Sequence, residues 1–148
     1  LSGQAQGKVV DFFLNHAFFA LAPPKSLDRN AFFWDLVDGL SVADGAATLA
    51  AMTVRSIGAA QAHMPERPGL WVVCGGGRHN AAILRGLEVE LAPARVAAAE
   101  AFGFNGDSVE AEAWAYLAVR SIDRLPITFP GTTGVAAAMT GGRLSEPG

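Results

Sequence analysis

Residues 70–80, LWVVCGGGRHN, constrain the fold more than any other part of this chain. An apolar run rich in β-forming residues ends in three consecutive glycines, and a polar segment that can start a helix follows. This order predicts a strand, a tight turn and a helix N-terminus. Glycine reaches positive φ and has no Cβ to obstruct a ligand, and a helix N-terminus favours an anion such as phosphate. The segment therefore indicates a turn that a nucleotide approaches, with an ordinary β-to-α connection as the alternative.

The glycines match neither common phosphate-binding motif in full. The pattern GxxxxGK[ST] does not fit, and in GxGxxG the positions of Gly75 and Gly77 fit while Asn80 occupies the last glycine position. The motif alone leaves both interpretations open.

The composition indicates one domain with surplus apolar surface. The chain has 148 residues, of which 51% are apolar and 17% charged, with a mean hydropathy of +0.27. A chain of this length buries roughly two-thirds of its unfolded surface, and we expect part of the remaining apolar surface to face a partner domain. The net charge is −3 and no run of Lys and Arg occurs, which argues against nucleic acid as a partner.

The cysteine content and the hydropathy pattern favour a cytoplasmic protein. Cys74 is the single cysteine, so no internal disulfide can form, and its place at the end of an apolar strand predicts a buried side chain. Charge, Gly or Pro interrupts every apolar stretch before the roughly 18 residues that a membrane span needs. The opening LSGQAQGKVVDFF looks like a helix already under way, so we expect a chain cut from something longer.

Periodicity and capping signals predict a mixed α/β order of elements. Ser41 is placed as an N-cap, with Asp44 in an imperfect capping box, and Gly58 indicates close contact of that helix with another element. Lys25 and Arg29 read as a solvated basic pair. Helices are expected over 4–19, 41–64, 80–91 and 108–123, strands over 70–74 and 95–98, a short helix with inward aromatic residues within 23–36, and a loop-like tail from 127.

The titratable residues form no recognisable catalytic or metal-binding constellation. His16, His63 and His79 are isolated, and their spacing is not that of a zinc site. Glu110 and Glu112 lie two positions apart on a predicted helix, so they point away from each other and cannot act as a paired acid and base. Their simplest role is to interact with the helix dipole.

Four segments in this order resemble the C-terminal part of the bacterial anhydro-N-acetylmuramic acid kinases. They are PPKSLDR at 23–29, VCGGGRHNAAIL at 73–84, DSVEAEAWAYLAVR at 107–120 and LPITFPGTTGV at 125–135. The helix at 44–53 and the glycine-rich ending MTGGR fit the same family, so the resemblance covers nearly the whole chain.

The resemblance implies a sugar kinase with an actin/hexokinase-like (ribonuclease H-like) ATPase fold, a sheet flanked by helices. ATP and sugar would bind between two α/β domains, with Mg²⁺ as cofactor. The reaction would hydrolyse the anhydro ring of 1,6-anhydro-N-acetylmuramic acid and phosphorylate O6 during cell-wall recycling. Residues 1–148 would be the C-terminal, nucleotide-side domain, and the family further implies a homodimer. The alternative is a non-catalytic nucleotide-binding or interaction module of the same superfamily.

The resemblance also assigns the site residues. Gly75, Gly76, Gly77 and Asn80 match the family's adenosine-binding segment, and Glu110 is the candidate to reach the sugar or its attacking water. The catalytic Asp of such kinases comes from the N-terminal half, and no Asp in these 148 residues lies in a matching motif. We therefore expect no catalytic residue and no metal ligand in this chain.

Overall fold

Strands β1 (Leu70–Val73) and β2 (Arg95–Ala98) pair in parallel, and α4 (Ala81–Glu90) connects them. The computed structural model describes residues 3–32 and 35–145, and within them the sheet has these two strands. The register runs from Leu70 opposite Arg95 to Val73 opposite Ala98. Both strands lie where the sequence predicts them, and the mixed α/β class with helices beside a small parallel sheet is confirmed.

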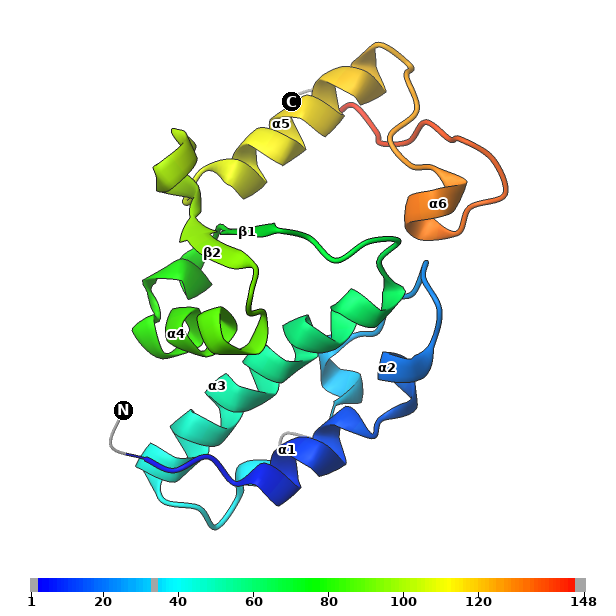
Figure 1. Ribbon diagram of the computed structural model, residues 1–148. Helices are drawn as coiled ribbons and strands as arrows, with labels where there is room; N and C mark the ends of the chain where they lie inside the picture. The colour runs from blue at the N-terminus through cyan, green and yellow to red at the C-terminus, as the bar shows by residue number, and fades with distance from the viewer. Residues whose placement is uncertain (1–2, 33–34, 146–148) are drawn as a thin grey trace.

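A layer of two helices covers one face of the sheet (Figure 1). Helix α3 (Val42–Ala59) packs on α4, and Val54, Leu87 and Leu91 form the buried core. Partly buried side chains from the sheet and its surroundings complete it: Ile57, Trp71, Val73, Ile83, Ala94 and Val96.

Glycines let α3 and α4 approach closely. A Cβ on Gly86 of α4 would lie 2.7 Å from Val54 Cγ2, and one on Gly58 of α3 would lie 2.6 Å from Glu90 Cγ. Real Cβ atoms are not found at such distances, so at Gly86 a larger residue would push against Val54, whereas at Gly58 the flexible end of the Glu90 side chain would have to move. The expectation of close contact at Gly58 is confirmed.

The opposite face of the sheet carries apolar side chains without a covering layer in the described residues. Trp71 and Val73 face the helices, whereas Leu70 and Val72 are 41% and 45% exposed. Cys74 continues the alternation on the same face as Leu70 and Val72, and it is exposed. The prediction of a buried Cys74 is wrong, because alternation along the strand turns its side chain away from the helical layer.

The helix expected over 4–19 is divided in two. Helix α1 (Gly7–Leu14) packs along α3, and α2 (Ala17–Ala20) begins after a break at which His16 Nδ1 accepts a hydrogen bond from the N–H of Phe18. A side chain that caps a new helix offers the backbone an alternative to continuing the old one.

Ser41 caps α3 as predicted, since its hydroxyl accepts the N–H of Asp44. Asp44 Oδ1 accepts the N–H of Gln4 at 2.7 Å, and this bond ties the start of the described chain to α3.

Short helices make up much of the remaining chain. One short helix is expected within 23–36, and the structure instead has two 3₁₀ turns there, η1 (Arg29–Ala31) and η2 (Asp35–Val37). Of the aromatic residues expected to face inward, Phe32 packs against Phe13. Phe33 and Trp34 lie outside the described residues. The other 3₁₀ turns are η3 (Ala60–His63), η4 (Gly76–His79) and η5 (Ala99–Phe102). The tail, expected as a loop, also contains α6 (Pro130–Thr133) and a bridge between Thr128 and Met139.

Helix α5 (Val109–Ile122) lies across the sheet from α3 and α4 (Figure 1) and has no buried side chain. Its apolar residues Trp114, Tyr116, Val119 and Ile122 are 57–68% exposed. A helix with such side chains in solvent lacks a packing partner among the described residues. No helix in the described part of the chain is both long and apolar enough to span a membrane.

Candidate functional site

The glycine turn (Gly75–Gly77) connects β1 to η4, and the structural requirement for glycine differs among its three positions. Gly75 has φ of +73°, a conformation that L side chains rarely adopt. Gly76 and Gly77 are not in that region, and a Cβ on either would meet no atom within 4 Å. The fold of the described residues therefore requires glycine at 75, whereas at 76 and 77 it leaves room for a molecule to approach the backbone.

A shallow depression of about 530 Å³ lies against this turn. It is lined by Gly76, His79, Asn80, Ala81, Ala82 and Arg85. Arg85 is an exposed cation at this depression that the sequence interpretation did not single out.

Asn80 has a defined structural role as the N-cap of α4. Its Oδ1 accepts the N–H groups of Ala82 at 3.0 Å and Ile83 at 3.3 Å. These donors of the first helical turn are occupied, so a phosphate could bind them only by displacing the cap. The accessible part of the turn is thus the surface over Gly76 and Gly77, and a contact between Asn80 and a nucleotide stays a prediction.

Arg78 is buried directly behind the turn and holds three partners. Its Nε donates to Glu100 Oε1 at 2.8 Å, and its Nη1 donates to Asp107 Oδ1 at 2.7 Å and to the carbonyl of Gly75 at 2.9 Å. Its side chain is 4% exposed. A buried guanidinium is tolerated when its charge is paired, and here two carboxylates and a carbonyl accept hydrogen bonds from Nε and Nη1.

This ion-pair cluster shifts the protonation equilibria of its members. The hydrogen bond from Arg78, followed by the nearby positive charges, lowers the pKa of Asp107 to about 2. The pKa of Glu100 is also lowered, chiefly by hydrogen bonds from its own backbone N–H and from Arg78, and the pKa of Arg78 is raised by Asp107 above its ordinary value. All three groups are charged at neutral pH.

The structure brings the glycine turn next to the segment that leads into α5. The N–H of Gly75 donates to the carbonyl of Gly106 at 2.9 Å, and Asp107 joins the same network through Arg78. Glu110 follows in the first turn of α5, exposed to solvent. Glu112 in the same turn accepts the hydroxyl of Ser108. The predicted nucleotide and sugar residues therefore belong to two connected segments.

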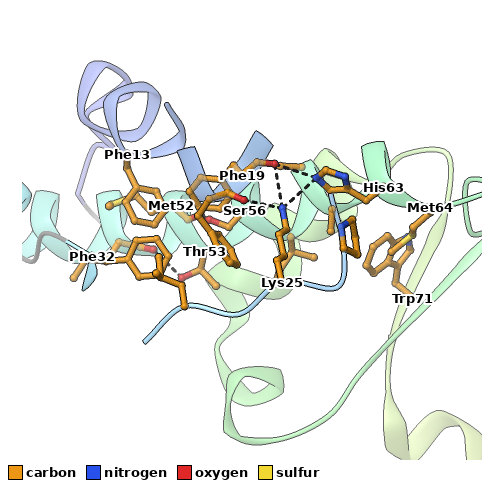
Figure 2. A pocket seen from close by; sticks show the side chains of 17 residues that line it. Phe13, Phe19, Lys25, Phe32, Met52, Thr53, Ser56, His63, Met64 and Trp71 are labelled. Carbon is orange, nitrogen blue, oxygen red and sulfur yellow. Dashed lines mark hydrogen bonds between the residues drawn. The ribbon is translucent and has the colours of Figure 1, made fainter. Parts of the chain in front are cut away.

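Lys25 lies elsewhere and is not a solvated residue. Figure 2 shows it on the wall of an apolar groove of about 1000 Å³ between α2, α3 and β1, and its Nζ contacts the carbonyls of Phe18 and Phe19 and His63 Nε2 at 2.8–3.2 Å. Trp71 also lines this groove, with its Nε1 buried and lacking a hydrogen-bond partner in the described residues. The cation connects the end of α2 to η3 and is not brought to the glycine turn.

Sequence reasoning missed the central role of Arg78. Its partners Glu100 and Asp107 are 22 and 29 residues further along the chain, and no local motif connects them. Within residues 3–32 and 35–145 no group of three or more His, Cys, Asp or Glu could hold a metal ion.

Comparison with known proteins gives one consistent match. Residues 1–146 match the family model described as anhydro-N-acetylmuramic acid kinase. Proteins of that name from Caulobacter vibrioides, Rhizobium rhizogenes and Rhodospirillum rubrum are 51%, 53% and 48% identical over 97%, 90% and 95% of this chain. The chain spans 38%, 36% and 37% of the length of these curated relatives.

Asp107→Asn tests the ion-pair cluster through pH. The pKa of Asp107 is about 2 in the folded protein against an ordinary 3.8, so its charge contributes stability that is complete well above pH 3.8 and is lost as pH falls toward 2. We expect the difference in unfolding free energy between wild type and variant to be constant above about pH 5 and to shrink on acidification. Urea unfolding at a series of pH values measures it. A difference that is independent of pH would contradict the pairing.

Proposed function

Because the chain belongs to the anhydro-N-acetylmuramic acid kinase family, we propose that it is the C-terminal, nucleotide-side part of an ATP-dependent kinase for 1,6-anhydro-N-acetylmuramic acid. In the proposed reaction water opens the anhydro bridge, its oxygen stays on C1, and the freed O6 receives the γ-phosphoryl group of ATP. The observation that carries the proposal is the family match over 1–146 together with the open glycine turn after β1. This reaction fits a cytoplasmic protein of cell-wall recycling.

The glycine turn is the part of this chain that fits ATP. Gly76 and Gly77 leave open space above the backbone, and the adjoining depression ends at the N-terminus of α4. Ligands of parallel α/β sheets bind beyond the carboxyl ends of the strands, which is where this turn lies. ATP supplies the phosphoryl group, and Mg²⁺ belongs to the proposal because phosphoryl transfer needs charge neutralisation. We assign no magnesium ligand to the described residues.

No aspartate here is assigned as the catalytic base. A general base works best with a pKa near the operating pH, whereas the pKa of Asp107 is about 2 and its carboxylate is bound to Arg78. Asp11 is paired with Arg55 at 2.8 Å. We propose that the base belongs to the part of the kinase beyond this chain and that Glu110 orients the sugar or its water.

The uncovered apolar surfaces support a second domain. Helix α5 and the bare face of β1 expose apolar side chains, and on the other side of the sheet an apolar groove lies between α2, α3 and β1 (Figure 2). A parallel pair of strands with free outer edges is a fragment of a larger sheet. We propose that the rest of the full-length protein covers these surfaces, since the chain is 38% of its Caulobacter relative, and completes an actin/hexokinase-like fold. A homodimer of the whole kinase is part of the same proposal.

Val119→Lys in the full-length protein tests whether α5 is covered. A buried unpaired ammonium is among the costliest substitutions, so we expect a loss of roughly 2 kcal/mol or more in unfolding free energy. Val89→Lys on α4, where the valine is 80% exposed, is the control and should stay within about 0.5 kcal/mol. Denaturant unfolding compares the two. Equally small effects would show that α5 faces solvent in the whole protein.

Gly76→Val tests the turn as a nucleotide site. The added methyl groups enter space that is open in the protein, so the variant should fold, but they obstruct the ligand. Steric overlap that costs about 1–3 kcal/mol corresponds to a roughly fivefold to 150-fold loss of affinity. Calorimetry with a non-hydrolysable ATP analogue and full-length protein measures it. Gly69→Val, in open space before β1, is the control, and unchanged affinity in both variants would make the turn an ordinary connection.

Glu110→Gln tests the sugar contact and the reaction itself. If the carboxylate orients the sugar or its water, its loss should lower kcat roughly 10²-fold in the full-length enzyme. Glu112→Gln, elsewhere on the same helix turn, should retain activity. The assay follows ATP-dependent phosphorylation of 1,6-anhydro-N-acetylmuramic acid. Wild-type kinetics in both variants would remove Glu110 from the site, and an inactive wild type would favour the non-catalytic module.

A further inference from the structure

We propose that Arg78 is a positioning residue that couples the nucleotide turn to the segment carrying Glu110. The inference rests on the proposed function, because that function gives the two segments their ligands. Its structural basis is the position of Arg78, which is buried between the glycine turn and the segment leading into α5 and forms hydrogen bonds with both.

On the turn side, Arg78 fixes the backbone at the residue with the most restricted conformation. Its Nη1 donates to the carbonyl of Gly75, which has φ of +73°. The N–H of Arg78 also donates to that carbonyl at 3.2 Å. Any change of the turn at Gly75 therefore changes the guanidinium position.

On the other side, Arg78 fixes the segment before α5 at two points. Nη1 binds Asp107 Oδ1 at 2.7 Å, two residues before the first residue of α5. Nε binds Glu100 Oε1 at 2.8 Å, and the same carboxylate oxygen accepts the N–H of Gly106 at 3.2 Å. Gly106 in turn accepts the N–H of Gly75, which closes a ring of contacts between the two segments.

The backbone at Gly106 passes close to the guanidinium, so a residue larger than glycine there would collide with Arg78. A Cβ on Gly106 would lie 2.5 Å from Arg78 Nε and 2.9 Å from Cζ. A planar fork that donates in several fixed directions matches this arrangement, and a lysine ammonium at the same position would keep the charge without the geometry. Arg78→Lys therefore separates the geometry of the contact from its charge.

The coupling has a defined chemical consequence. Glu110 lies in the first turn of α5, so the direction of that helix start sets where its carboxylate points. A misplacement of about 1 Å costs catalysis roughly 10²-fold. Arg78 thus aligns the sugar-side carboxylate with a nucleotide on the glycine turn.

The test uses Arg78→Lys, Asp107→Asn and the double variant in the full-length enzyme. We expect each single variant to raise the KM for ATP and to lower kcat, both by roughly tenfold or more, at temperatures where the variant is folded. The double variant should be little worse than the poorer single one, because both break the same contact. Arg55→Lys, which alters the exposed Arg55–Asp11 pair, is the matched control and should retain wild-type kinetics.

Amide hydrogen exchange supplies a readout without activity. Arg78→Lys should speed exchange at 75–77 and at 105–110 together, whereas Arg55→Lys should change neither segment. Normal kinetics with a lowered melting temperature alone would make Arg78 a purely structural residue and overturn the proposal, as would faster exchange confined to one segment. Wild-type protein without kinase activity would refute the proposed function, and the exchange result would still decide the coupling.

Discussion

The close packing of α3 on α4 is the constraint on which the rest of the structure depends. Gly86 of α4 lies directly against Val54 of α3, and Leu87 and Leu91 extend this contact into the core beneath the strands. Because α4 connects β1 to β2, its position fixes both the register of the sheet and the place where β1 must turn. The end of the glycine turn is accordingly anchored by a closely packed helix, which a candidate ligand site built from backbone requires.

The layer formed by α3 and α4 covers only one face of the sheet, so the packed core and the candidate site residue Glu110 lie on opposite sides of it. On the covered side, side chains such as Trp71 and Val73 pack on α3 and α4. On the other side lie exposed strand residues and α5, whose first turn holds Glu110 (Figure 1). Apolar surface left open beside a candidate site is the expected property of a domain whose cleft is completed by another part of the protein.

Local chemistry made much of the fold predictable. Ser41 caps the helix that follows it, and the strand at 95–98 forms as expected, because each depends on residues close in sequence. The prediction that Cys74 is buried is wrong. Alternation along a strand identifies its two faces, but it does not show which face the helices cover. The contacts of Arg78 could not be predicted from the sequence, because its partners Glu100 and Asp107 come from distant segments of the chain.

The charges around the turn bear on which part of the proposed nucleotide would lie against it. The charge of Arg78 is offset by Glu100 and Asp107, so this ion-pair cluster carries no surplus positive charge for a triphosphate. The Asn80 side chain already occupies helix-start donors that would otherwise attract an anion. What remains open is the backbone over Gly76 and Gly77, which suits a planar or sugar group approaching closely, with the exposed Arg85 at the adjoining depression. In the proposed kinase the turn therefore receives the adenosine end, and the clamp on the phosphates must come chiefly from the facing domain.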